Sequence, residues 1–281
     1  MPPDMTEEER TKRREENIRL IQSFRLMDNP FMGRVFQDEI ELGQLAATIM
    51  TGRDDIIVTS VITEHELPNL RGRSVRLDIH AFDHGKKEID IEIQRAKKGA
   101  TPKRIRYNSA MMDANFLVQR EDFEDLPEQY IFFVTENDVT GLHRLISSVE
   151  RRMGDEWSVP FRDGIHIAYI DSSQADDSPL GKLMHDFHCT RAADMYYPLL
   201  KEKVRYYKEN ETGVTIMSDL FEKYLTEEHN QGKAEGIATT TIKIVRNLLS
   251  TGKLSYEEIA KNADTSLDEV LRIAKESNMA Y

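Results

Sequence analysis

The sequence predicts an α/β domain with a mixed β-sheet, followed by a helical C-terminal region. Three observations support this fold class. Segments between residues 56 and 94 are β-branched or alternate polar with apolar residues, which is typical of strands. A helical segment then separates them from two apolar, strand-like segments at 130–137 and 164–171. Beyond residue 180 the apolar spacing becomes helical. This order favours a sheet flanked by helices.

The composition indicates a soluble globular protein and argues against a membrane-spanning or secreted one. The 281 residues allow one sizeable domain with an appendage, and 39% hydrophobic with 31% charged residues is typical of a soluble globular protein. No apolar stretch approaches the ~18 residues that would cross a bilayer. The charged N-terminus is no secretory signal, and with Cys189 alone no intrachain disulfide forms, so we expect a cytoplasmic protein. The net charge of −12 argues against nonspecific coating of nucleic acid but permits a local basic groove.

The N-terminal half alternates helices and strands. Residues 5–26 are charged and lack Gly and Pro, which predicts a solvated helix. Apolar residues at helical spacing then predict one core-facing helix after Asn29-Pro30; they are Phe31, Val35, Phe36, Ile40, Leu45 and Ile49. Residues 56–63, 74–82 and 88–94 predict three strands. Thr101 as N-cap and Pro102 as the first helical residue predict a helix from there.

Helices dominate the C-terminal part. We expect helices within 179–189 and 192–210, then a long one from Thr215 to about Ser250 that is interrupted by Gln231–Gly236. Two short helices follow, joined at Ala263-Asp264-Thr265, and their N-caps are Ser255 and Ser266. The pair resembles a helix-turn-helix. Residues 237–281 carry six Lys/Arg against six Asp/Glu, which favours docking to a partner or to the chain's own core over DNA recognition.

In the segment RLDIHAFDHGKKEIDIEIQ (76–94), isoleucines alternate with a polar face that is mostly acidic and includes Asp78, Asp90, Glu92 and Gln94. We expect the apolar residues of this hairpin to share one buried face, and a loop at His84-Gly85-Lys86 with Gly85 at positive φ. In that register, the numbers of two residues that face each other across the hairpin add up to 170. The residues of that face are Val75, Leu77, Ile79, Ala81, Ile89, Ile91 and Ile93. In this register Asp78 lies opposite Glu92, His80 faces Asp90, and Gln94 shares the polar face. Acidic side chains that face each other on a sheet repel one another, so this arrangement does not stabilise the fold.

Two interpretations of this acidic face are open: a solvated sheet surface, or a site for a hard divalent cation such as Mg²⁺ or Mn²⁺. The next segment favours the cation site, because no acidic residue occurs from Arg95 to Met112. Metal-binding acids beside cations suit phosphodiester chemistry, in which the cations hold the DNA backbone. The candidate DNA contacts are Lys97, Lys98, Lys103, Arg104, Arg106 and Tyr107.

Asp78 followed by Glu92-Ile93-Gln94 across a hairpin, and then by a basic helix, resembles the PD-(D/E)XK nuclease signature in its D…ExQ form. Over residues 28–230 the chain resembles the PD-(D/E)XK nuclease family transposases, relatives of the recombination-promoting nucleases. The resemblance rests on five sequence segments: NPFMGRVF, GRSVRLDIHAFD, DIEIQRAKKGATPKRIRYNSAMMDANFL, EDLPEQYIFFVTENDV and PLGKLMHDFHCTRAADMYY.

The resemblance implies a restriction-endonuclease-like domain at 28–205, between a charged helix at 1–27 and a helical extension at 206–281. It implies that Asp78 and Glu92 bind Mg²⁺ or Mn²⁺ and that Gln94 stands where a Lys usually positions the attacking water. Two departures are visible: Leu77 replaces the signature's proline, and Gln94 has no titratable group, which leaves the proton acceptor open.

Glu39 is a candidate further metal ligand, although Asp38 and Glu41 are not distinguished from it by the sequence. His185, His188 and Cys189 lack the further thiolates of a structural zinc site, so we do not expect zinc there. The predicted function is metal-dependent DNA cleavage in recombination or DNA mobility, with DNA, a divalent metal and a second copy of the chain as candidate partners. The alternative is a DNA-binding or protein-assembly module that keeps the fold without cutting.

Overall fold

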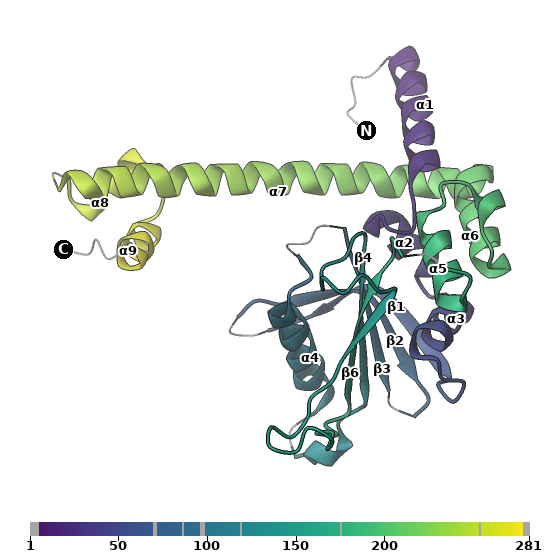
Figure 1. Cartoon of the computed structure of the whole chain (residues 1–281). Coiled ribbons are helices and arrows are strands. Elements are labelled where there is room, and N and C mark those ends of the chain that lie inside the picture. The colour runs from purple at the N-terminus through teal and green to yellow at the C-terminus, as the bar shows by residue number, and fades with distance from the viewer. Residues whose placement is uncertain are drawn as a thin grey trace. The chain divides into compact units, whose positions relative to one another are not determined.

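The computed structural model describes residues 6–69, 72–85, 87–95, 99–118, 120–174, 176–252 and 254–277. It contains a six-stranded sheet in the order β1-β2-β3-β4-β6-β5, with helices on both faces (Figure 1). The strands are β1 (Val58–Leu67), β2 (Val75–Asp83), β3 (Glu88–Gln94), β4 (Gln129–Thr135), β5 (Ile146–Val149) and β6 (Ile165–Asp171).

The helices of the sheet-bearing part are α1 (Glu7–Ser23), α2 (Asn29–Phe36), α3 (Ile40–Thr51), α4 (Pro102–Phe116), α5 (Pro179–His188) and α6 (Pro198–Glu209), with short 3₁₀ turns η2 (Phe123–Asp125) and η3 (Ala192–Asp194). The C-terminal helices are α7 (Glu211–Thr251), α8 (Tyr256–Asn262) and α9 (Leu267–Glu276). Over the residues described, none of these helices is long and apolar enough to cross a bilayer.

The sheet is mixed, as the sequence predicts. β1, β2 and β3 pair antiparallel, β3, β4 and β6 pair parallel, and β5 returns antiparallel to β6. α4 connects β3 to β4, and its Thr101 cap accepts a hydrogen bond from the Arg104 N–H as predicted. The short strand β5 lies between the predicted strands at 130–137 and 164–171, where the sequence predicts no strand because four residues carry little periodicity.

Each face of the sheet has its own core. On one face, Ile89, Ile91 and Ile93 of β3 pack in a cluster with buried residues of α2, α3, α5 and α6. On the other face, Ile131 and Phe133 of β4 pack with apolar residues of α4. The polar residues of β3 point to the α4 side, because they alternate with the three isoleucines. Glu88, Asp90 and Glu92 are therefore buried under a helix, and Gln94 at the end of the strand is half-buried.

The register of the β2–β3 hairpin is the predicted one. Ile79 pairs with Ile91, and His80 pairs with Asp90, which gives the expected sum of 170. The prediction of positive φ at Gly85 is wrong, since this residue is not among those in the left-handed region. Asp83 closes the hairpin instead, because its carboxylate accepts a hydrogen bond from the Lys87 N–H at 2.7 Å.

The prediction of one shared apolar face along β2 is wrong. Ile79 belongs to the cluster on the α2–α3 side, whereas Leu77 belongs to the α4 side. Two features coincide at this change of face: Glu64 of β1 has φ of 51°, and no pair joins it to Asp78. The regular alternation of both strands is interrupted there, so Asp78 sits where β2 changes face.

Two helix predictions also need correction. The predicted core helix is two helices, α2 and α3, because the chain breaks at residues 37–39 with Asp38 at φ of 60°. Ile40 is consequently 46% exposed, and Leu42 is buried in its place. The glycines at 232 and 236 do not interrupt α7, which is continuous from Glu211 to Thr251. A glycine inside a helix costs only about 1 kcal/mol, unlike a proline.

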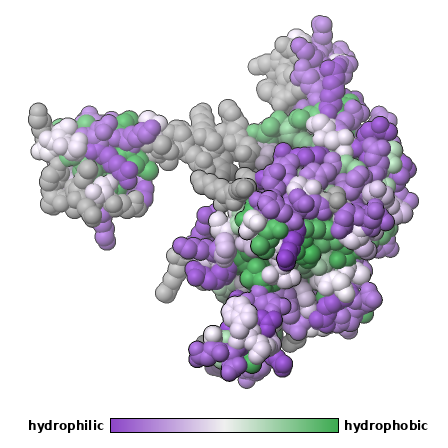
Figure 2. Space-filling model, viewed as in Figure 1, coloured by the Kyte–Doolittle hydropathy of each residue, from purple (hydrophilic) through white to green (hydrophobic). Residues whose placement is uncertain are grey.

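Two compact units are distinguished by their contacts: Met1–Leu220, which holds the sheet, and Phe221–Tyr281. The second unit has a separate core in which Val245 and Leu249 pack with Ile259, Val270 and Ile273. Ser255 and Ser266 cap α8 and α9 as predicted. On the face of the first unit seen in Figure 2, hydrophilic residues surround a central apolar area. The predicted divisions at 27/28 and 205/206 stay predictions.

Candidate active site

Asp78 is held at the end of the β2–β3 ladder. The backbone pairs run from Phe82–Glu88 to Ile79–Ile91 and stop before Asp78. There, Oδ2 of Asp78 accepts a hydrogen bond from the Ile93 N–H (2.8 Å). The side chain of β2, and not its backbone, thus satisfies this N–H group of β3. Oδ1 accepts a second hydrogen bond from Nδ2 of Asn29 at the start of α2 (3.2 Å). Burial raises the pKa of Asp78 to about 6, although the Ile93 N–H and Arg104 oppose the rise.

Glu92 lies on β3 with its side chain turned to α4. It is 0% exposed, and its Oε1 has no hydrogen-bond partner among the described residues. Its Oε2 contacts the guanidinium of Arg104, one turn into α4. Burial first, and then repulsion from the Asp78 carboxylate, raise the pKa of Glu92 to about 8, while Arg104 and the backbone N–H of Asp78 lower it. A buried acid in this state binds either a proton or a cation.

Asp90 extends the acidic row one step along β3. It is 0% exposed, and neither carboxylate oxygen has a hydrogen-bond partner among the described residues. Burial, followed by repulsion from Glu92 and Asp78, raises its pKa well above the ordinary value. His80 lies opposite Asp90 in the ladder, but its ring instead contacts His65, with Nδ1 atoms 2.9 Å apart, and Glu88 at 3.5 Å.

Arg104 contacts two of the predicted catalytic residues, Glu92 and Gln94. Besides its contact with Glu92, its Nη1 donates a hydrogen bond to Oε1 of Gln94 (2.8 Å), and its guanidinium lies over the ring of Phe133 at 5.6 Å. The sequence predicts a DNA contact for this arginine, whereas the structure gives it two protein partners inside the site. Gly99 also shapes the site, because a Cβ there would lie 1.9 Å from Oε1 of Gln94.

The other predicted DNA contacts are only partly near the site. Lys103 and Arg106 are exposed on α4. Tyr107 is also at the surface, but its hydroxyl donates to the Arg73 carbonyl (2.6 Å) and accepts from Asn69 (3.1 Å). Lys97 and Lys98 lie outside the described residues.

Arg95 and Glu39 have partners of their own. Arg95 bridges Asp28 at 2.6 Å and Glu136 at 3.2 Å, so its charge is matched. The carboxylate of Glu39 contacts Lys203 of α6, which gives it a partner other than the Asp78–Glu92 pair.

One group of three ligand atoms within 4.8 Å of one another is present among the described His, Cys, Asp and Glu residues: His185, Asp186 and Cys189. Asp186 is already engaged there, because its oxygens accept hydrogen bonds from the Tyr196 N–H (2.7 Å) and the Tyr197 N–H (2.8 Å). Its carboxylate therefore fixes the chain after η3, which is a structural role.

The donor set at Asp78 and Glu92 suits a hard divalent cation. Mg²⁺ is usually bound by one or two carboxylates, with water and phosphate oxygens completing its shell. Two carboxylates are present, and the buried Oε1 of Glu92 has no protein donor. A cation would also offset the burial that raises both pKa values and the repulsion that Asp78 exerts on Glu92.

Three residues of this site were not given a role in it from the sequence. Asp90 could have been included, because it shares the alternation of Glu92. Asn29 gives no such signal, since it lies 49 positions before Asp78. Gly99 is also invisible without the fold. Comparisons of the chain with protein-family models, with curated proteins and with solved structures give no match.

Proposed function

We propose that the chain is a divalent-metal-dependent endodeoxyribonuclease with a PD-(D/E)XK-type site in a restriction-endonuclease-like domain. One observation carries the proposal: Asp78 and Glu92 meet where the β2–β3 ladder ends, both with raised pKa values, and Glu92 keeps a buried oxygen without a partner. Such an arrangement costs stability unless it serves a ligand. The resemblance to the PD-(D/E)XK transposases supports a role in DNA recombination or mobility.

The protein's own groups have distinct parts in this proposal. Asp78 and Glu92 hold Mg²⁺ or Mn²⁺, which when bound supplies the positive charge that activates water and stabilises the leaving oxygen. The Ile93 N–H and Asn29 fix the direction of the Asp78 carboxylate. Gln94, held by Arg104, orients a water or a phosphate oxygen and cannot take a proton.

Arg104 and α4 supply the contacts to DNA. The Arg104 side chain is 36% exposed, so the guanidinium that neutralises Glu92 also reaches the surface, where a phosphate would lie. Lys103 and Arg106 are exposed on the same helix and would contact flanking phosphates.

A second candidate is a module of the same fold that binds DNA or a protein partner without cutting. The contact of Arg104 with Glu92 favours it, because an internal cation already neutralises the acid that the metal would use. In such a protein the carboxylates and Arg104 would form a structural ion pair.

Nicking of supercoiled plasmid by the purified full chain separates the two candidates. We expect nicking in Mg²⁺ or Mn²⁺ that is lost, by at least about a hundredfold, in Asp78→Asn and Glu92→Gln, because each isosteric change removes a ligand charge. Asp54→Asn, an exposed acid in the loop after α3, is the matched control and should cut normally. Unimpaired cleavage by either site variant would contradict the nuclease assignment. DNA binding in Ca²⁺ without cleavage in any metal would favour the second candidate.

A further inference from the structure

A groove of about 590 Å³ lies on the face of the sheet opposite α4. Its floor includes Tyr130 and Phe132 of β4 and Ala168 of β6, which belong to the core cluster on the α2–α3 side. The end of α3 with Arg53 forms one wall, and the segment 149–163 forms another. Glu92 faces α4, so the groove and the carboxylate site are on different faces of the sheet. The volume is that of an ordinary small-molecule site.

Two stacked rings form a platform in the groove. Tyr130 and His166 are direct partners in the β4–β6 ladder, and their rings stack with centroids 4.5 Å apart and planes 19° apart. Tyr130 is buried, whereas the His166 side chain is 50% exposed. One face of the imidazole is therefore covered by tyrosine, and the ring remains accessible for a further planar group.

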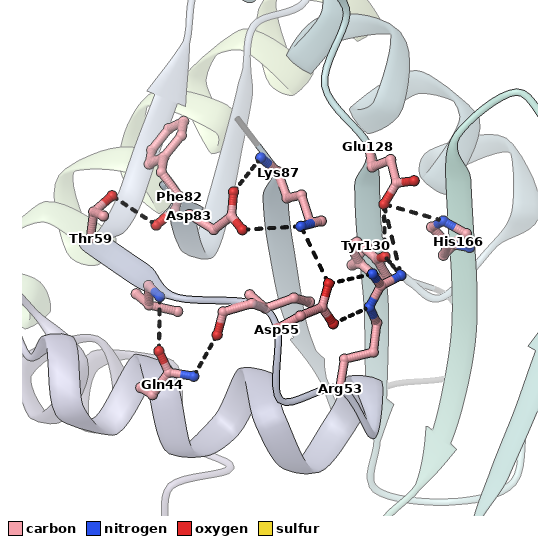
Figure 3. Close-up of polar contacts among 12 residues, drawn as sticks. Gln44, Arg53, Asp55, Thr59, Phe82, Asp83, Lys87, Glu128, Tyr130 and His166 are labelled. Atoms are coloured by element: carbon pink, nitrogen blue, oxygen red, sulfur yellow. Dashed lines mark hydrogen bonds and ion pairs between the residues drawn. The ribbon is translucent and has the colours of Figure 1, made fainter. Parts of the chain in front are cut away.

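Polar contacts hold the platform in place (Figure 3). The Tyr130 hydroxyl accepts a hydrogen bond from Nη1 of Arg53 (2.8 Å) and donates one to Oε2 of Glu128 (2.9 Å). Arg53 is fixed in turn by two hydrogen bonds to Asp55, at 2.8 and 2.6 Å. The same Glu128 oxygen lies 4.0 Å from Nε2 of His166. The rings are thus positioned before any ligand arrives, which lowers the entropy cost of binding.

Among the described residues, the arginines of the groove are paired with acids except for one. The lining contains four guanidinium groups and two carboxylates, and Arg53 pairs with Asp55 beside it. Arg151 is paired with Asp163 and Arg152 with Glu150. Arg162 has no ion pair with any described residue and is exposed at the rim. An anionic group would be drawn to this unmatched arginine.

We infer that this groove binds a nucleotide, whose base stacks on His166 and whose phosphate pairs with Arg162. Stacking on an aromatic ring and a charged contact to arginine are the two features by which proteins hold nucleotides without reading their sequence. The nucleotide is either free or one unit of a single strand. A free nucleotide and a nucleotide within a strand both offer a base for stacking and a phosphate for the arginine.

Calorimetric titration of the full chain in EDTA tests the inference, because chelation prevents nucleotide from binding through metal at the carboxylate site. The probes are AMP, ATP, inorganic phosphate and a 5′-phosphorylated DNA oligonucleotide. We expect saturable binding of AMP and ATP that is tighter than that of phosphate. Binding of the oligonucleotide alone would assign the groove to a strand and still support the inference.

Matched variants identify the site. His166→Leu and Arg162→Gln should each weaken nucleotide binding about fivefold or more, and His166→Phe should retain most of it because the ring is kept. Arg162→Gln changes an exposed side chain, so loss of folding will not explain its effect. Asp78→Asn, in the carboxylate site, should bind nucleotide normally whether or not the protein is a nuclease. Absence of saturable binding by every nucleotide probe, or unchanged binding by both His166→Leu and Arg162→Gln, would overturn the inference.

Discussion

At the scale of single residues, the carboxylate of Glu92 lies in an unfavourable environment. It is fully buried next to a second acid, and only one of its oxygens contacts a cation. Removal of a carboxylate from water is unfavourable, so the group holds its proton to a higher pH. Asp78 and Asp90 show the same response. Three neighbouring acids therefore make the folded state costly at neutral pH until a cation enters.

This state predicts how stability depends on pH. Glu92 and Asp78 have pKa values of about 8 and about 6 in the folded protein, against ~4 in an unfolded chain. Between pH ~4 and ~8 the folded state binds more protons, so these groups reduce the free energy of unfolding as pH rises. Glu92→Gln removes the contribution of Glu92 to this loss of stability. At pH 8 we therefore expect the variant to be more stable than the natural protein by ~1 kcal/mol or more.

Urea unfolding in EDTA at pH 5, 6, 7 and 8 measures this difference. Asp54→Asn, which changes an exposed acid, should follow the natural protein at every pH. If the curve for Glu92→Gln also ran parallel to that of the natural protein, the raised pKa of Glu92 would be refuted.

At the scale of elements, the decisive arrangement is the crossing of α4 over the polar face of β3. This helix turns an alternating strand into a buried acidic row and brings Arg104 to both Glu92 and Gln94. The connection to α4 passes close to the strand at Gly99, where a side chain would meet Gln94. The position of Gln94 thus depends on a glycine as well as on an arginine.

Gly99→Ala tests that dependence. The added Cβ would overlap the end of a flexible side chain, so Gln94 should move while the fold is retained. We expect a change in melting temperature of no more than a few degrees but at least a tenfold loss of metal-dependent nicking. Gly154→Ala is a suitable control, since a Cβ there meets no atom within 4 Å. Equal nicking by both variants would show that the placement of Gln94 is unimportant.

Local signals predicted much of this arrangement. The hairpin register followed from alternation, and the start of α4 followed from Thr101 and Pro102. The burial of the acids did not follow, because alternation shows that a strand has a polar face but not whether a helix covers it. The Asn29–Asp78 hydrogen bond and the change of face in β2 depend on contacts between distant segments, which leave no periodic pattern.

At the scale of the whole molecule, the chain divides into two units with separate cores. The carboxylate site and the groove both belong to Met1–Leu220. The core of the second unit draws its residues from the end of α7 and from α8 and α9. We therefore expect the sheet-bearing unit to fold without that second core.

Deletion of residues 237–281 should leave this first unit folded. We expect the truncated chain to keep its cooperative unfolding and its metal binding, because the sheet, its flanking helices and the carboxylates are all retained. Loss of self-association or of a partner is the expected defect. Circular dichroism and size-exclusion chromatography measure the two effects, and unfolding of the truncated chain would contradict the division into units.

Mn²⁺ binding to the full chain measures directly whether Asp78 and Glu92 hold a divalent cation. Electron paramagnetic resonance titration at pH 8, without DNA, reports the free ion and hence the number of sites. We predict one site in the natural protein and in Asp54→Asn, and its loss in Asp78→Asn and Glu92→Gln, each checked for folding by circular dichroism. Binding of Mn²⁺ by both site variants with the affinity of the natural protein would contradict the account.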